Sequence, residues 1–181
     1  MRIFISGHTS GIGKYLYDNL DGEIIGASRS NGKPITEISK WFDESCDLFI
    51  NNAYDDSNST AQSESLKYVY SKWKNDSSKM IISIGSIAPD FEDYDKPSWY
   101  NDSAKRYTEG KKMLDKTNYK YYMKYDEVRC TIIRPGYVDT PRISSLPVKK
   151  SNMLPVDSIL KVVNFIINFD GRIREITLEN K

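Results

Sequence analysis

Three side chains in the second half of the chain, Ser86, Tyr107 and Lys111, are suited to acid–base chemistry. Tyr107 and Lys111 are four positions apart, which places a phenol and an ammonium one turn apart on the same face of a helix predicted from Tyr107 to Tyr122. A free tyrosine has a pKa of ~10, so proton transfer near neutrality requires this pKa to fall by a few units. A fall of three units corresponds to about 4 kcal/mol of interaction free energy that favours the phenolate. A nearby ammonium favours the phenolate, so this pair predicts a proton donor and acceptor.

The same spacing also occurs at Tyr68/Lys72 and Tyr70/Lys74, so the spacing alone does not identify the pair. Tyr107 and Lys111 differ from these rivals because they follow a predicted strand at 80–86 that ends in Ser86, and they precede the next strand. Ligands of open α/β sheets bind at the carboxyl ends of the strands. We therefore expect Ser86 to hold a substrate carbonyl, although a serine at a strand end is also a common turn former.

A glycine-rich turn lies near the start of the chain, between an apolar strand at 2–6 and an amphipathic helix with Ile12, Leu16 and Leu20 on one face. Its sequence is Ser-Gly-His-Thr-Ser-Gly-Ile-Gly-Lys, from residue 6 to residue 14. The open amides at a helix N-terminus attract a pyrophosphate, and glycines allow the backbone to approach it closely. The turn predicts a dinucleotide cradle, with a plain tight turn as the alternative.

The end of the second predicted strand, at 23–27, bears on the choice of cofactor. An acidic residue there binds the ribose 2′-hydroxyl of NAD, whereas an arginine accommodates the 2′-phosphate of NADP. This chain has Ser28 followed by Arg29. A guanidinium forms charge-assisted bonds to phosphate oxygens, so we predict NADP(H) in preference to NAD, against the alternative of a solvated surface arginine.

Helical and strand patterns alternate along the chain, which predicts an α/β fold: a doubly wound, Rossmann-like parallel sheet in three layers. We expect about seven strands in the order 3-2-1-4-5-6, with the seventh beyond. Ile35 is assigned to a short third strand and 36–44 to a short helix. Residues 47–51 are assigned to the fourth strand, 55–63 to a polar loop and 173–178 to the last strand.

Two further motifs occur in the order expected after these elements, namely Asn51-Asn52-Ala53 and Pro135-Gly136 through Thr140. Together with the glycine turn and Ser86, Tyr107 and Lys111, they resemble the short-chain dehydrogenase/reductase family over nearly the whole chain. The resemblance implies reversible hydride transfer between NADP(H) and a small carbonyl/alcohol pair. The alternative is an NADP-binding sensor or scaffold with little catalysis.

The resemblance also implies which residues bind the cofactor. The asparagines would line its site, Lys111 would hold the nicotinamide ribose, and Val138 and Thr140 would orient the nicotinamide carboxamide. The implied cofactor-binding set is Gly7, Thr9, Ser10, Gly11, Ile12, Gly13, Ser28, Arg29, Asn51, Asn52, Ala53, Tyr107, Lys111, Pro135, Gly136, Val138 and Thr140. The catalytic set is Ser86, Tyr107 and Lys111.

The chain departs from the family pattern at two points. Tyr54 replaces the glycine that normally follows Asn51-Asn52-Ala53, and the family's relay asparagine in the helix containing Leu66 to Lys74 has no clear counterpart. The segment 141–154 would be the substrate loop. Its charges, from Arg142, Lys149 and Lys150, favour an acidic substrate or are simply solvated.

Length and composition limit the other possibilities. A chain of 181 residues with a net charge of +1 predicts one domain over 1–181 and gives no indication of nucleic acid or membrane as a partner. Cys46 and Cys130 are expected to be buried free thiols, and the single histidine, His8, gives no basis for a metal site. We expect a cytoplasmic protein, and the family resemblance implies a homodimer or homotetramer.

Overall fold

The computed structural model describes residues 1–93, 100–144 and 146–180. The strands are β1 (Arg2–Ser6), β2 (Glu23–Ala27), β3 (Leu48–Asn51), β4 (Met80–Ile84), β5 (Arg129–Pro135) and β6 (Glu175–Leu178). The α-helices are α1 (Gly11–Asn19), α2 (Ala61–Trp73), α3 (Asp102–Tyr122), α4 (Pro141–Ser144) and α5 (Asp157–Asn168). Short 3-10 helices are formed by Arg29–Asn31, Ile35–Lys40, Ala88–Asp93 and Lys150–Asn152.

The six strands form one parallel sheet in the order β2-β1-β3-β4-β5-β6. This confirms the predicted α/β architecture, with six strands among the described residues instead of the expected seven. The predicted third strand at Ile35 is wrong, because Ile35–Lys40 forms a 3-10 helix. Ile35 and Ile38 bury their side chains from this short segment without joining the sheet. β2 is therefore the edge of the sheet, and the strand predicted as the fourth is β3.

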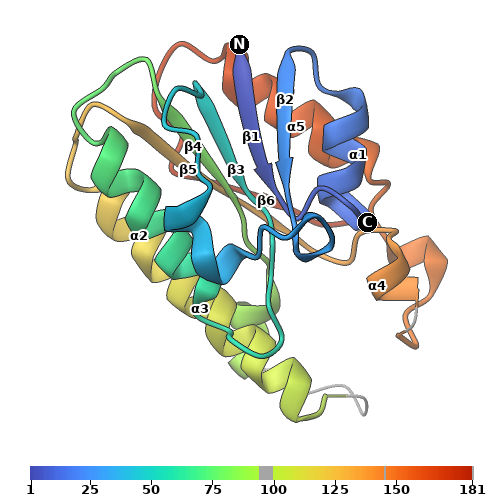
Figure 1. Cartoon of the computed structure of the whole chain (residues 1–181). Helices are drawn as coiled ribbons and strands as arrows, with labels where there is room; N and C mark the ends of the chain where they lie inside the picture. Colours follow the sequence, from blue (N-terminus) through green and yellow to red (C-terminus); the bar gives the residue numbers. More distant parts are fainter. Residues whose placement is uncertain (94–99, 145, 181) are drawn as a thin grey trace.

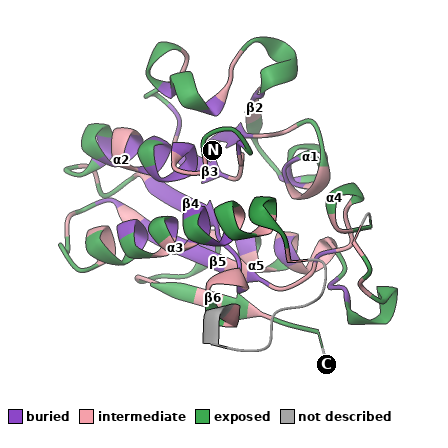
Figure 2. Cartoon of the chain, turned by 90° about the horizontal axis from the view of Figure 1, so that it is seen from below, coloured by how far each residue is buried: buried purple, intermediate pink, exposed green. Residues whose placement is uncertain are grey.

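Helices cover both faces of the sheet, which gives the three predicted layers (Figure 1). Helices α1 and α5 pack together on one face, and α2 and α3 pack together on the other. The strands between them are mostly buried, whereas the outer helix surfaces are exposed (Figure 2). Among the described residues, no helix is both long and apolar enough to cross a membrane.

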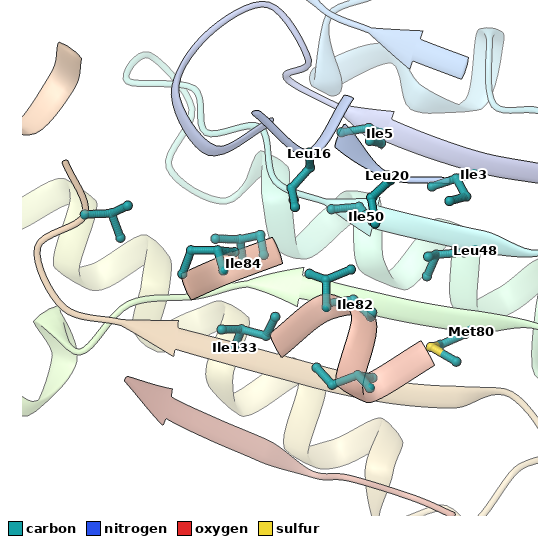
Figure 3. Close-up of a cluster of buried hydrophobic side chains, with 14 of the residues drawn as sticks. Ile3, Ile5, Leu16, Leu20, Leu48, Ile50, Met80, Ile82, Ile84 and Ile133 are labelled. Atoms are coloured by element: carbon teal, nitrogen blue, oxygen red, sulfur yellow. The ribbon is translucent and has the colours of Figure 1, made fainter. Parts of the chain in front are cut away.

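Two apolar clusters hold the layers together, one on each side of the sheet. The cluster facing α1 and α5 includes Ile5, Ile50 and Ile82 from the strands and Leu16 from α1 (Figure 3). All four are fully buried. The alternate residues of the central strands point to the other face of the sheet, where Phe4, Phe49 and Ile81 belong to the second cluster. The fully buried parallel strands explain the apolar runs in the sequence.

Helix α3 begins at Asp102, five positions before the predicted start at Tyr107. Asn101 caps it, because its side-chain oxygen accepts a hydrogen bond from the Ala104 amide at 3.0 Å. Tyr107 and Lys111 therefore lie well inside the helix rather than in its first turn. A side chain within a helix is held more firmly than one in a fraying end, which favours a fixed geometry for this pair.

The glycine turn packs tightly against the start of α1. A Cβ on Gly13 would lie 2.2 Å from the Gly7 carbonyl oxygen and 2.5 Å from Nδ2 of Asn52. Gly7 itself has φ +74, a conformation that L side chains rarely adopt. The turn can therefore approach the helix this closely only because residue 13 has no side chain.

We predict that Gly13→Ala lowers the free energy of unfolding by about 2 kcal/mol or more, because the new methyl group would collide with backbone atoms. Urea unfolding of the two proteins measures the difference. The control is Gly32→Asn, since residue 32 has open space around it and asparagine tolerates its φ of +74. Equal stability of Gly13→Ala and the parent protein would contradict the packing argument.

Candidate active site

A cavity of about 860 Å³ opens at the carboxyl ends of the parallel strands. Its walls come from the glycine turn after β1, from Ser28 after β2, Asn52 after β3, Ser86 after β4 and Gly136 after β5. Helix α3 and the segment around α4 close the remaining sides. This volume lies within the range of sites for cofactors and small ligands, and its place is that of ligand sites in open α/β sheets.

Most of the predicted cofactor residues line this cavity. They are Gly7, Thr9, Ser10, Gly11, Ile12, Ser28, Arg29, Asn52, Ala53, Tyr107, Lys111, Pro135, Gly136, Val138 and Thr140. Gly13 and Asn51 lie behind the cavity wall, where Gly13 packs against Gly7 and Asn51 is fully buried. The side chain of Asn51 donates to the Gln62 carbonyl oxygen at 3.0 Å and so links β3 to α2.

Asn52 and Ser6 hold the glycine turn in place. The Asn52 side-chain amide donates to the carbonyl oxygens of Ser6 at 3.1 Å and Gly7 at 3.3 Å. The Ser6 hydroxyl oxygen accepts from the amides of Asn52 at 3.0 Å and Ala53 at 3.1 Å. The ends of β1 and β3 are thus fixed to one another, which keeps the turn open towards the cavity.

His8 has a packing role at the back of the turn. Its ring fills the space that a Cβ on Gly26 would occupy, with the nearest ring atoms 2.4 Å from that point. It also contacts the ring of Tyr17, with the ring centres 4.9 Å apart.

Cys46 and Cys130 are buried free thiols, as predicted. Burial raises the pKa of the Cys130 thiol to about 12, so this group stays protonated near neutral pH. Among the described residues, no cluster of three His, Cys, Asp or Glu side chains could hold a metal ion.

Hydroxyl groups and a guanidinium gather at the β2 end of the cavity. Ser28, Arg29 and Ser30 all line it, and the hydroxyl oxygens of the two serines are 2.8 Å apart. Arg29 is exposed, so its charged group is open to solvent and to ligands. The Ser28 amide donates to Oδ1 of Asn31 at 2.8 Å, which fixes this short segment.

Ser86, Tyr107 and Lys111 meet on the opposite wall. The hydroxyl groups of Ser86 and Tyr107 are hydrogen-bonded to each other, and the Ser86 oxygen also accepts a hydrogen bond from the Ala88 amide at 3.1 Å. Nζ of Lys111 lies 5.4 Å from the centre of the Tyr107 ring. The strand end and one face of α3 therefore bring together the three side chains that the sequence singled out.

The rival Tyr-x-x-x-Lys pairs are used in packing. Tyr70 belongs to the apolar cluster under α2 and α3, stacks on Tyr121 and donates to the Asp126 carboxylate. Lys72 pairs with Glu44 at 2.9 Å. The Tyr70 phenol and the Lys72 ammonium on α2 therefore each have a partner within the protein.

Gln62 is a partner of Lys111 that the sequence analysis missed, because residues 55–63 were assigned to a loop. It belongs to α2. Its Oε1 accepts a hydrogen bond from Nζ of Lys111 at 2.8 Å, and the Ile84 carbonyl oxygen accepts a second at 2.7 Å. The side-chain amide of Gln62 donates to the Asn51 carbonyl oxygen at 2.7 Å and to that of Ile84 at 3.0 Å. Gln62 therefore binds the buried ammonium directly and joins it to β3 and β4.

Burial dominates the acid–base properties of this wall. Desolvation lowers the pKa of Lys111 to about 7, and the nearby Arg142 charge acts in the same direction. The expected fall in the Tyr107 pKa is not found in the protein alone. Burial raises the pKa of Tyr107, while the Ser86 hydrogen bond and the Arg142 charge oppose that rise.

Tyr54 and Arg142 form an aromatic and cationic cover over Tyr107. The Tyr54 and Tyr107 rings meet edge to face, with their centres 5.0 Å apart. The Arg142 guanidinium carbon lies 4.8 Å from the centre of the Tyr107 ring and 4.9 Å from that of Tyr54. A glycine at position 54 would remove one side of this arrangement. The presence of Tyr54 in place of the family's glycine therefore changes the cavity wall beside Tyr107.

Comparison with solved structures identifies the fold. An alcohol dehydrogenase from Thermococcus sibiricus, complexed with 5-hydroxy-NADP, matches over 99% of this chain and 96% of its own, with a TM-score of 0.68 at 15% identity. A 3-alpha-hydroxysteroid dehydrogenase from Pseudomonas sp. B-0831, complexed with NADH, matches over 98% and 95%, with a TM-score of 0.71 at 14% identity. An oxidoreductase of the short-chain dehydrogenase/reductase family from Burkholderia thailandensis matches over 98% and 91%, also at 0.71 and 14%.

No protein-family model and no curated protein sequence matches the chain. At these identities the structural matches establish the fold. The chain has the fold of short-chain dehydrogenases/reductases, which confirms the predicted architecture and the resemblance at the level of structure.

We predict that Lys111 makes stability depend on pH. Its pKa is about 7 in the folded protein and 10.5 when unperturbed. Between these values the unfolded chain holds a proton that the folded protein has released, so the free energy of unfolding rises with pH. From pH ~7 to pH ~9 the expected gain is about 2 kcal/mol. Urea unfolding at both pH values should show this gain in the parent protein and not in Lys111→Met.

The control for this titration is Gln62→Glu. A carboxylate in place of the Gln62 amide would stabilise the ammonium and raise the Lys111 pKa, so the gain between the two pH values should shrink. If Lys111→Met shows the same gain as the parent protein, another group is responsible.

Proposed function

We propose that this protein is an oxidoreductase of the short-chain dehydrogenase/reductase type that uses NADP(H) to interconvert a small carbonyl compound and its alcohol. The observation that carries the proposal is the convergence of Ser86, Tyr107 and Lys111 on a cavity whose other wall is the glycine turn. A dinucleotide-binding scaffold has no need for a hydrogen-bonded serine and tyrosine backed by a buried lysine at the same cavity.

The cavity fits an extended dinucleotide. Gly7 and Gly13 let the turn and α1 lie close together, and the turn lines the cavity at the N-terminus of a nine-residue helix, where backbone amides attract phosphate. Ser28 and Arg29 would bind the adenosine ribose and its 2′-phosphate at one end. Val138 and Thr140 would hold the carboxamide at the other. A nicotinamide cofactor, when bound, supplies the hydride chemistry.

The residues of the opposite wall have distinct roles in carbonyl reduction. The Ser86 hydroxyl would donate a hydrogen bond to the carbonyl oxygen, and the Tyr107 phenol would give that oxygen its proton. When protonated, Lys111 has three N–H donors and uses two on Gln62 and Ile84, which leaves one for a ribose hydroxyl. Positive charge near the phenol, from Lys111 and Arg142, favours the phenolate that remains.

A sensor or scaffold function is the second candidate, and the cover over Tyr107 favours it. The Tyr54 ring and the Arg142 guanidinium both contact the ring of Tyr107, which restricts access to it. NADPH oxidation with a panel of small aldehydes, ketones and quinones discriminates between the two functions. Tight cofactor binding with no turnover of any member would support the sensor.

We predict that Tyr107→Phe lowers turnover by about 10²-fold or more, because it removes the proton donor, while NADPH binding changes little. NADPH oxidation followed by absorbance measures turnover with the carbonyl compound that the panel identifies. Tyr68→Phe is the matched control, since Tyr68 belongs to a rival pair on α2, and it should retain activity. Full activity of Tyr107→Phe would eliminate the proposed catalytic role.

We predict that Arg29→Ala weakens NADPH binding about 10-fold to 100-fold and leaves NADH binding nearly unchanged, because only NADPH carries the 2′-phosphate. Fluorescence titration of the bound nicotinamide measures both affinities. The parallel substitution Lys33→Ala, on the same loop but outside the cavity lining, should affect neither affinity. An equal loss for both cofactors would mean that Arg29 does not distinguish them.

A further inference from the structure

Arg142 occupies an unusual place for a charged loop residue. It lies on α4, directly after the strand-end segment of Pro135 to Thr140, and lines the cavity. Its guanidinium lies over the rings of Tyr54 and Tyr107, and its side chain is 51% exposed. Stacking on two rings holds a planar guanidinium at a defined place and orientation. The positive charge is therefore placed next to the predicted proton donor.

Among the described residues, the acidic side chains that line the cavity are Asp55 and Asp56. Asp55 is buried, and its Oδ1 accepts from the amide of Ser57 at 2.9 Å and from its hydroxyl at 2.6 Å. Asp56 reaches Arg142 at 3.4 Å, with the two side chains 59% and 51% exposed. An ion pair this exposed contributes little, so another carboxylate can replace Asp56 at small cost.

Several apolar side chains also line the cavity that Arg142 lines. Ile87 and Phe91 line it from the segment after β4, and Ile143 and Leu146 line it from α4 and the residues that follow. Such a wall suits a hydrocarbon chain. A ligand that matches all these features has an apolar chain, a carbonyl near Ser86 and Tyr107, and an anionic group beside Arg142.

We propose that the substrate is an oxo acid, or the corresponding hydroxy acid, with an apolar side chain, and that Arg142 binds its carboxylate. The proposal rests on the proposed function, and it names the substrate class of the same site. Arg142 contacts the Tyr107 ring, so a carboxylate on Arg142 and a carbonyl at the phenol are one short molecule apart. A guanidinium can bind both carboxylate oxygens, which fixes the orientation of the carbonyl. The substrate carboxylate would replace Asp56 as the partner of Arg142, and the displaced Asp56 carboxylate, which is already largely exposed, would be hydrated instead.

The test compares an oxo acid with its neutral ester. The probes are 2-oxohexanoate and methyl 2-oxohexanoate, which share the apolar chain and the carbonyl. Their affinities are measured by isothermal titration calorimetry on the full chain, both with and without saturating NADPH. We expect the acid to bind about 10-fold or more tightly than the ester, and Arg142→Gln to bring the two affinities close together.

Two further variants sharpen the result. Asp56→Asn removes the competing carboxylate and should tighten binding of 2-oxohexanoate without changing that of the ester. Lys149→Gln removes an exposed positive charge from the same loop outside the cavity lining, and it should preserve the preference for the acid. A general electrostatic attraction would make Lys149→Gln and Arg142→Gln equivalent, and that result would overturn the proposal.

The outcomes separate this proposal from the proposed function. If NADPH binds and the ester is reduced but the acid is not preferred, the substrate class is wrong and the oxidoreductase stands. If NADPH does not bind, the oxidoreductase is wrong, and the acid-to-ester ratio without cofactor still decides the role of Arg142. Failure of both probes to bind the parent protein overturns the carboxylate site.

Discussion

The candidate site depends on how the protein accommodates the buried ammonium of Lys111. A cation with 3% exposure needs acceptors, and it finds them in Oε1 of Gln62 and the carbonyl oxygen of Ile84. Those bonds join α3 to α2 and to the end of β4. Because Tyr107 lies one turn before Lys111 and Ser86 lies two residues after Ile84, the same bonds bring the phenol and the hydroxyl together. The cost of burying the charge appears in its lowered pKa.

The architecture was predictable where local sequence and tertiary environment agree. The fully buried central strands appear as apolar runs, and the positions of Ser86, Tyr107 and Lys111 follow from the order of elements. The strand predicted at Ile35 is wrong because this apolar side chain is buried from a 3-10 helix rather than from a strand. The N-cap residue Asn101 marks the true start of α3, and asparagine is a residue type favoured at that position.

The contacts of Gln62 and Arg142 were beyond prediction from local sequence. Gln62 and Lys111 are 49 positions apart, and Arg142 and Asp56 are 86 apart. Such contacts arise only when the strand ends and the helices are brought together. The resulting cavity is lined by basic side chains at two places. Arg29 follows β2 at one end, Lys111 and Arg142 lie at the opposite wall, and the glycine turn lies between them. A ligand with anionic groups along its length complements this arrangement.

We propose that one cavity holds an extended dinucleotide from the end of β2 to the wall of α3. Titration of isotope-labelled protein with NADPH, followed by the NMR shifts of its backbone amides, tests it most directly. We expect saturable shifts along the glycine turn, at Ser28 and Arg29, and at Val138 and Thr140, while Gly171 beyond the opposite strand ends stays unchanged. Shifts limited to one end of the cavity, or none at millimolar NADPH, would contradict it.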